Sequence, residues 1–165
     1  MSNDNTFNPG VGVGNNDRSK EMGNLAVSTP FEPGSVNKII TAAAAIEYGL
    51  TTPEEVLQVP GNIFMSGVSV EDAWEHGLAP YTTTGVFGKS SNVGTLMLVE
   101  RVGEDRFADM LARFGLGQRT DVGLPGESAG SVPNRDQWSG GTFANLPIGQ
   151  GLSMTLLQMT AMYQA

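Results

Sequence analysis

Cysteine is absent from the chain, so neither a disulfide nor a thiolate metal site is possible. The single histidine, His76, excludes a zinc triad built on several histidines. The 9 basic residues are outnumbered by 17 acidic ones, which gives a formal net charge of -8. Because a nucleic-acid surface needs clustered basic residues to neutralise phosphates, this balance excludes a nucleic-acid partner.

Long hydrophobic runs are missing as well. The sequence contains no stretch of about 18 or more apolar residues, the length that a helix needs to span a membrane. The first five residues, MSNDN, lack the basic and apolar regions of a signal peptide. The chain ends at Ala165 inside an apolar helical pattern with no stop signal, so we expect residues 1–165 to be one partial domain, truncated at both ends.

The residues that are present favour a single globular domain. The chain has 165 residues, of which 39% are hydrophobic and 16% charged, enough for one real core. Residues 1–30 and 117–150 are rich in loop-forming residues. Periodicity and capping residues predict strands at 63–65 and 68–70, a short helix starting at 51–55, and longer helices at 35–48, 82–87, 93–102, 104–114 and from 153 onward.

The stretch 32–45 predicts a tight turn that runs straight into a helix. Pro33 and Gly34 mark the turn, and Ser35 is a favoured residue at a helix N-terminus. Ser35 and Lys38 are three positions apart and therefore share one helix face. A serine hydroxyl becomes a nucleophile when a base takes its proton, and lysine is that base when its amine is neutral. The alternative is a capping serine beside a solvated lysine.

A second polar group, Ser90-Ser91-Asn92, lies at a predicted break between two apolar helices. Side chains at such a break can turn into a cleft while packed neighbours hold them in place. Ser90 can relay a proton, and the amide of Asn92 can both donate to and accept from a substrate amide. The alternative is an ordinary turn between helices with a capping asparagine.

Other polar residues carry weaker signals. His76 among acids is either a ligand or base, or, more commonly, a packing residue. Glu71, Asp72 and Glu75 form either a carboxylate cluster or a solvated surface, and we favour the surface. Glu127 is either a catalytic carboxylate or part of a surface turn after Pro-Gly, and we favour the turn.

The two serine motifs together resemble the penicillin-binding transpeptidases. Residues 31–38 (FEPGSVNK) are similar to the family's active-site serine block, and residues 88–95 (GKSSNVGT) to its second block. Similarity continues in the same order at residues 114–117, 122–127 and 148–151. It is closest to class B enzymes of the septal, cell-division type from actinobacteria. The resemblance implies the α/β penicillin-recognising fold, here mostly its helical part with an incomplete sheet.

The resemblance also implies a role for each matching residue. Ser35 would be the acylated nucleophile and Lys38 its general base, while Ser90 would pass protons and Asn92 would bind the substrate backbone. The implied reaction is D-Ala-D-Ala transpeptidation between peptidoglycan stem peptides, without a metal or organic cofactor. The implied partners are stem peptides, β-lactam antibiotics and cell-division proteins. The implied location is the extracytoplasmic face of the bacterial membrane, held by an anchor outside this chain.

The sequence departs from the family pattern in one respect. The third block, Lys-Thr/Ser-Gly, is absent, and no lysine follows Lys89. We therefore expect the longer protein to be an enzyme, and the 165-residue chain alone to be inactive or nearly so and marginally stable. Two alternatives stay open. One is a β-lactamase or β-lactam sensor with Glu127 as its only candidate acid, and the other is a non-catalytic, wall-associated binding module.

Overall fold

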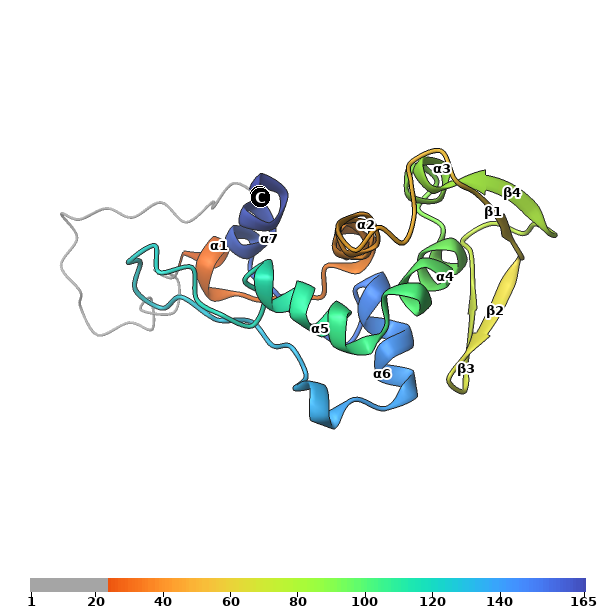
Figure 1. The fold of residues 1–165 in the computed structure, drawn as a ribbon. Helices are drawn as coiled ribbons and strands as arrows, with labels where there is room; N and C mark the ends of the chain where they lie inside the picture. Colours follow the sequence, from red (N-terminus) through yellow and green to blue (C-terminus); the bar gives the residue numbers. More distant parts are fainter. Residues whose placement is uncertain (1–23) are drawn as a thin grey trace, which may run out of the picture.

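The structure, a computed structural model, describes residues 24–165, so the loop predicted for the first residues lies largely outside it. Helices dominate, and two short antiparallel ribbons lie at one edge of the molecule (Figure 1). None of the described helices is long and apolar enough to cross a membrane. The elements in chain order are α1 (Leu25–Ser28), η2 (Gly34–Asn37), α2 (Lys38–Glu47), β1 (Val56–Val59), β2 (Asn62–Met65), β3 (Val68–Glu71), β4 (Ala79–Thr82), α3 (Thr83–Gly88), α4 (Asn92–Val102), α5 (Glu104–Arg113), η3 (Arg135–Gln137), α6 (Gly140–Asn145), η4 (Leu146–Ile148) and α7 (Leu156–Gln164).

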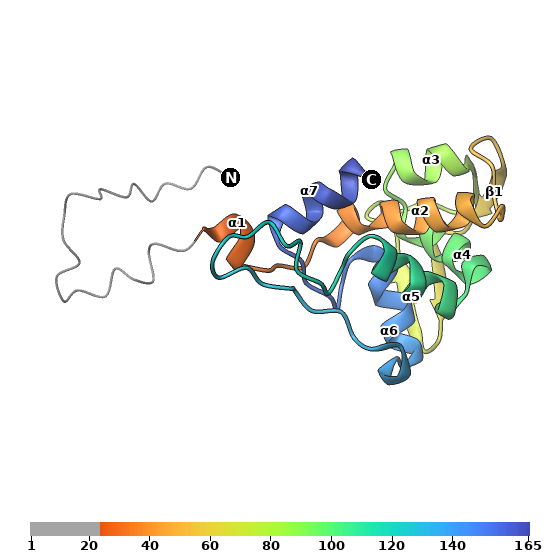
Figure 2. The same ribbon diagram turned by 60° about the vertical axis from the view of Figure 1, so that its left-hand side comes forward.

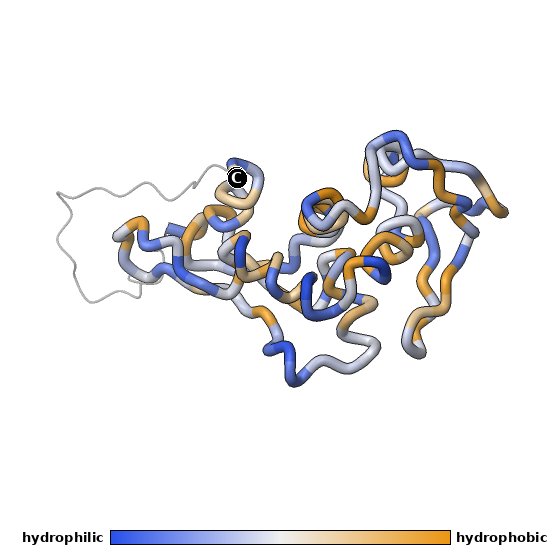
Figure 3. Tube along the Cα trace, in the orientation of Figure 1, coloured by the Kyte–Doolittle hydropathy of each residue, from blue (hydrophilic) through white to orange (hydrophobic). Residues whose placement is uncertain are grey.

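The main core forms where α2, α4 and α5 meet. Apolar residues run along α2 and α4, as Figure 3 shows, because both helices are packed on several sides. α5 is amphipathic and buries Phe107, Met110 and Leu111, three members of the predicted stripe, while Phe114 packs at the edge of the core. Phe107 also meets Phe143 of α6 edge-on, with ring centroids 6.2 Å apart. The site helix α2 is thus anchored in the interior.

The two ribbons lie on one side of the helical body (Figure 1). β2 and β3 pair antiparallel with Met65 opposite Val68, and the two residues between them, Ser66 and Gly67, both have positive φ. Such turns match the twist of a hairpin and fix its register. β1 and β4 pair separately, and Leu57 and Val59 of β1 pack in a second, smaller core against α3 and α4.

The C-terminal part returns to the N-terminal residues. Phe31 and Met154 exchange two backbone hydrogen bonds, and Ser131 and Ser153 form another bridge. α7 comes close to η2, where the hydroxyl of Tyr163 donates to the carbonyl of Val36 at 3.1 Å (Figure 2). Residues from the C-terminal part of the chain therefore contact the segments on both sides of the turn before α2.

Most of the predicted elements are present, with two corrections. The helix predicted to start at 51–55 is wrong: those residues form a turn that leads into β1, because pairing with β4 outweighs the local helix-start signal. A helix was not expected within 117–150, yet α6 forms after Ser139, which caps it reciprocally with Thr142. The predicted mixed fold with an incomplete sheet is confirmed by the two separate two-stranded ribbons.

Candidate active site

The turn that carries Ser35 is held from the far end of the sequence. Gly34 has φ +58° and its N–H donates to the carbonyl of Gly149 at 3.1 Å. The side chain of Glu32 accepts from the N–H of Gly151 at 3.0 Å. A Cβ on Gly149 would overlap the carbonyl of Gly34, so glycine is required there. Ser35 itself lies exposed in η2, at the entrance to α2.

Lys38 begins α2, and its backbone N–H donates to the carbonyl of Ser35. Its side chain is almost fully buried, with 3% exposed. The amine donates to the carbonyl of Ser90 at 2.6 Å and to its hydroxyl at 3.0 Å. Burial lowers the pKa of Lys38 from 10.5 to about 8, while the negative charge of Asp72 opposes this shift. The structure therefore joins the two motifs through Lys38 and Ser90.

Ser90 lies between α3 and α4 in an unusual backbone conformation. Its φ is +59°, which a residue with a Cβ rarely adopts. Such strain costs on the order of 1–3 kcal/mol and persists where surrounding contacts enforce it. The bond from the Lys38 amine to the Ser90 carbonyl is one of those contacts. The turn exposes Ser90 while keeping its hydroxyl beside the amine.

Asn92 is held at the start of α4, facing the end of β3. Its amide nitrogen donates to the carbonyl of Glu71 at 2.9 Å, and its side chain is half-buried. Its amide oxygen makes no hydrogen bond within the described part of the chain, so it can accept from another amide. The capping residue of α4 is Ser91, whose hydroxyl accepts from the N–H of Gly94, and not Asn92 as the alternative for this motif supposed.

Asp72 is a buried residue of this site that the sequence patterns did not reveal. We expected Asp72 on a solvated surface, but its side chain is 0% exposed. Its carboxylate accepts from the Ser91 hydroxyl at 2.8 Å, the Val93 N–H at 3.1 Å and His76 Nε2 at 2.9 Å. The sequence carried no signal for this, because Asp72 stands among exposed acids and its partners from α4 lie about twenty positions away. His76 is accordingly a packing and pairing residue, stacked on Trp74.

Glu127 is placed differently from both readings of the sequence. Its side chain is buried rather than on a surface turn. Both the hydroxyl and the N–H of Thr120 donate to its carboxylate and lower the pKa of Glu127. The backbone N–H of the next residue, Ser128, donates to the carbonyl of Val27 at the end of α1. Glu127 therefore ties a loop together.

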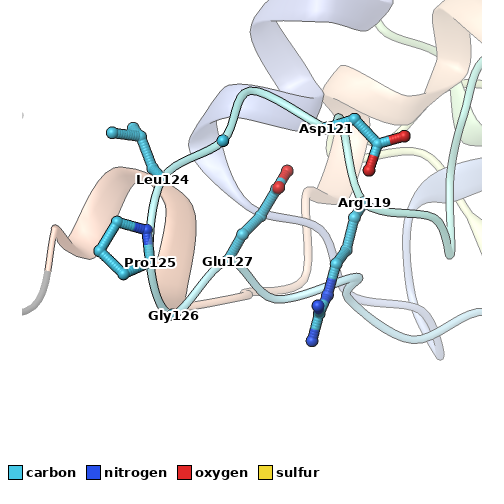
Figure 4. Close-up of a pocket in the computed structure, with 7 residues that line it drawn as sticks. Arg119, Asp121, Leu124, Pro125, Gly126 and Glu127 are labelled. Atoms are coloured by element: carbon cyan, nitrogen blue, oxygen red, sulfur yellow. The ribbon is translucent and has the colours of Figure 1, made fainter.

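A hollow on this loop is lined by Arg119, Asp121 and the segment 123–127 (Figure 4). None of the four predicted site residues borders it. The carboxylate of Glu127 accepts two hydrogen bonds from Thr120, as described above. Within residues 24–165 no cluster of three potential metal ligands exists.

Comparison with known proteins gives a consistent result. The family described as the penicillin binding protein transpeptidase domain matches residues 1–165. Penicillin-binding protein PbpB of Mycobacterium tuberculosis (strain ATCC 25618 / H37Rv) is 73% identical over 165 residues, 100% of this chain and 24% of that protein. Peptidoglycan D,D-transpeptidase FtsI of Escherichia coli (strain K12) is 34% identical over 164 residues, 99% of this chain and 27% of FtsI.

Solved structures agree with the sequence comparisons. The crystal structure of penicillin-binding protein 3 from M. tuberculosis, complexed with ampicillin, is similar with a TM-score of 0.89 and 71% identity. The match covers 98% of this chain and 35% of that one. The chain spans about a quarter of the length of the curated relatives it matches. The predicted family is confirmed, and two relatives with 73% identity are mycobacterial proteins. The chain belongs to the penicillin-binding protein transpeptidase family.

Proposed function

We propose that this chain forms the serine-bearing part of a peptidoglycan D,D-transpeptidase, with Ser35 as nucleophile, Lys38 as general base, Ser90 as proton relay and Asn92 as the ligand of the substrate backbone. The observation that carries the proposal is the contact between the amine of Lys38 and Ser90. Lys38 is buried and lies one helical turn after Ser35. Family membership and the 73% identity to PbpB support the same chemistry.

The proposed reaction proceeds through an ester of Ser35. The Ser35 hydroxyl oxygen attacks the carbonyl of the penultimate D-Ala while its proton passes to the neutral amine of Lys38. The proton then moves by way of the Ser90 hydroxyl to the nitrogen of the terminal D-Ala, which leaves as the amine. An amine of a second stem peptide attacks the ester, forms the cross-link and returns the proton to Ser35. A β-lactam ring would acylate the same oxygen and remain attached.

The environment of Lys38 suits this base role. A lysine with a pKa of 10.5 is almost wholly protonated at pH 7, whereas a pKa of about 8 leaves about a tenth of the amine neutral. That is a gain of roughly 300-fold in base. A neutral amine has two N–H groups and one lone pair. Because two N–H groups satisfy the Ser90 carbonyl and hydroxyl, the lone pair stays available for the Ser35 proton.

The wider setting of the reaction follows from the relatives. PbpB and FtsI bear the names of a penicillin-binding protein and a peptidoglycan D,D-transpeptidase. We propose that residues 1–165 are part of a larger transpeptidase domain, that the third motif lies elsewhere in that domain, and that the whole protein acts on stem peptides at the extracytoplasmic face of the membrane together with cell-division proteins. Crystal structures of the mycobacterial relative with aztreonam and ampicillin support β-lactams as ligands.

The test uses a hybrid PbpB, in which this chain replaces the matching 165 residues of M. tuberculosis PbpB. We expect fluorescent penicillin to label the hybrid stoichiometrically on Ser35, and Ser35→Ala to abolish labelling while the protein stays folded. The 165-residue chain alone should label slowly or not at all. Undiminished labelling of the Ser35→Ala hybrid would overturn the assignment, and rapid labelling of the isolated chain would refute its predicted inactivity.

A hydrolytic function has less support. A β-lactamase needs a group that activates water for deacylation, and Glu127, the candidate from the sequence, is engaged by Thr120. Mass spectrometry of the penicillin-treated hybrid separates the two reactions. We expect a stable adduct on Ser35, and rapid loss of the adduct with turnover of antibiotic would favour hydrolysis instead.

A further inference from the structure

The buried carboxylate of Asp72 is not used in the chemistry proposed above. Its side chain is fully buried, and a buried ionised carboxylate is costly unless several donors compensate it. Three donors do so: Ser91 Oγ, the Val93 N–H and His76 Nε2. Two of these belong to the first turn of α4, where a negative charge is also favoured by the helix dipole. Asp72 thus fixes the backbone of the residues next to Ser90 and Asn92.

The position of Asp72 itself is set by the β2–β3 hairpin. Asp72 directly follows β3, whose Val70 is buried in the main core. The preceding residue, Glu71, offers its carbonyl to Asn92. At the end of the strand, the carboxylate of Asp72 therefore holds Ser91, and the carbonyl of Glu71 holds Asn92. Two adjacent residues thus fix two adjacent residues at the start of α4.

The charges around Asp72 come from several elements. Lys38 of α2 donates to Ser90 while Asp72 accepts from Ser91, so consecutive residues of one turn separate the amine from the carboxylate. His76 lies in the same loop as Asp72, and its Nδ1 faces the carbonyl of Gly77. Beyond the histidine, Tyr81 of β4 meets its ring edge-on, and Lys89 lies over the rings of Trp74 and Tyr81. Glu71 and Glu75 are exposed.

We infer that Asp72 is a positioning residue of acyl transfer, whose carboxylate locks the Ser90–Asn92 turn and places a negative charge across that turn from the Lys38 amine. The inference rests on the proposed function. It gives Asp72 two separable effects. The hydrogen bonds hold Ser91 and Val93, the residues on either side of Asn92. The charge favours the protonated form of Lys38 and so opposes the lowering of its pKa by burial.

Two substitutions in the hybrid PbpB separate these effects. Asp72→Asn keeps the shape and can still accept from Val93, while its amide can donate to His76 or Ser91; it removes the charge and reverses the direction of one hydrogen bond. Asp72→Ala removes charge and hydrogen bonds together. Asp136→Asn, an exposed change in η3 with the same loss of charge, is the matched control.

The readout is the second-order rate constant of acylation by a fluorescent penicillin, measured from pH 5.5 to 9. The acid limb of the profile reports the deprotonation of the base. With Asp72→Asn we expect this limb to move to lower pH, because the Lys38 amine loses the nearby negative charge. With Asp72→Ala we expect the rate to fall at least tenfold across the whole range, and with Asp136→Asn the wild-type profile.

The outcomes distinguish failure of this inference from failure of the proposed function. Labelling that survives Ser35→Ala removes the proposed function itself. If labelling needs Ser35 but the acid limbs of wild type and Asp72→Asn superimpose, the role of Asp72 is overturned. An Asp72→Asn hybrid that fails to fold by circular dichroism also overturns it, because Asp72 would then be required for folding and not for positioning. A folded Asp72→Ala hybrid with the wild-type rate would do the same.

Discussion

The two halves of the site are built by different kinds of contact. Ser35 of η2 and Lys38 at the start of α2 are three positions apart and joined by a backbone hydrogen bond, so their relation is local in the sequence. The Ser90–Asn92 turn gains its shape from Asp72 and Glu71, about twenty positions earlier, and from the amine of Lys38. A local half tolerates change in the rest of the molecule, whereas a half assembled from distant partners depends on each of them.

Lys38 is the one side chain on which both halves depend, so its loss has the largest expected effect. Lys38→Met removes the base and the bonds to Ser90 while filling a similar volume. Acylation of the hybrid PbpB by fluorescent penicillin should fall by about 10²–10⁴-fold, the usual contribution of general-base catalysis. Arg106→Met, a change at an exposed cation of α5, should leave the rate unchanged. A Lys38→Met hybrid that acylates within threefold of wild type would contradict the base role.

Gly149 tests how far the local half depends on the end of the chain. Gly149→Ala places a Cβ against the Gly34 carbonyl and adds strain at φ +81°, whereas Gly151→Ala carries similar strain at φ +76° with open space around its Cβ. We expect Gly151→Ala to lower the free energy of unfolding by about 1–2 kcal/mol, and Gly149→Ala by about 1–3 kcal/mol more. Chemical denaturation of the hybrid PbpB measures both. Equal losses of unfolding free energy in the two variants would show that the close approach of Gly149 to Gly34 does not contribute to stability.

Lys38 also links stability to pH. Its pKa of about 8 in the folded chain lies below 10.5, so between these values the unfolded chain binds more protons and stability rises with pH. The penalty for burying the charged amine is complete below about pH 8 and is relieved as the pH approaches 10.5. The free energy of unfolding of wild type relative to Lys38→Met should therefore rise from pH 8 to 10.5, with a slope of at most about 1.4 kcal/mol per pH unit. A flat difference would mean that the amine is solvated.

The smallest expected effect concerns the two serines that cap α4 and α6, only one of which should also position the site. Ser91 caps α4 and also donates to Asp72, whereas Ser139 caps α6 and has no acidic partner among residues 24–165. Ser91→Ala and Ser139→Ala should each lower the free energy of unfolding by about 1 kcal/mol, the usual worth of such a cap. Only Ser91→Ala should also slow acylation in the hybrid, by several-fold. If Ser91→Ala and Ser139→Ala changed the acylation rate equally, Ser91 would act only as a helix cap and not in positioning the site.

The sequence predicted the parts of the site that are local. The spacing of Ser35 and Lys38, the apolar periodicity of α2, α4 and α5, and the polar break at Ser90 are readable one helix at a time. The contact between Lys38 and Ser90 followed from the motif pair only through the family resemblance, since nothing in the residues between them requires it. Local sequence patterns were thus sufficient to predict the individual elements, but they did not predict how these elements pack against one another.

The parts that were missed depend on distant partners. β1 carries a helix-start signal before it and becomes a strand because β4, more than twenty positions later, pairs with it. Asp72 differs from its acidic neighbours only in being covered by α4. Glu127 follows a Pro-Gly pair that indicates a surface turn, yet Thr120 draws its carboxylate inward. In each case the interaction that decides the structure involves residues too far along the chain for a local sequence pattern to include.

The clamp on the Ser35 turn has a consequence for the order in which the protein matures. Its bonds join Glu32 to Gly151 and Gly34 to Gly149, positions more than a hundred residues apart. On the ribosome, α2 can coil as soon as it emerges, but the turn before it stays unclamped until Gly149 and Gly151 have been synthesised. Closing so long a loop carries a large entropic cost and comes late. The turn that carries Ser35, the proposed nucleophile, therefore takes its final shape well after α2 has formed.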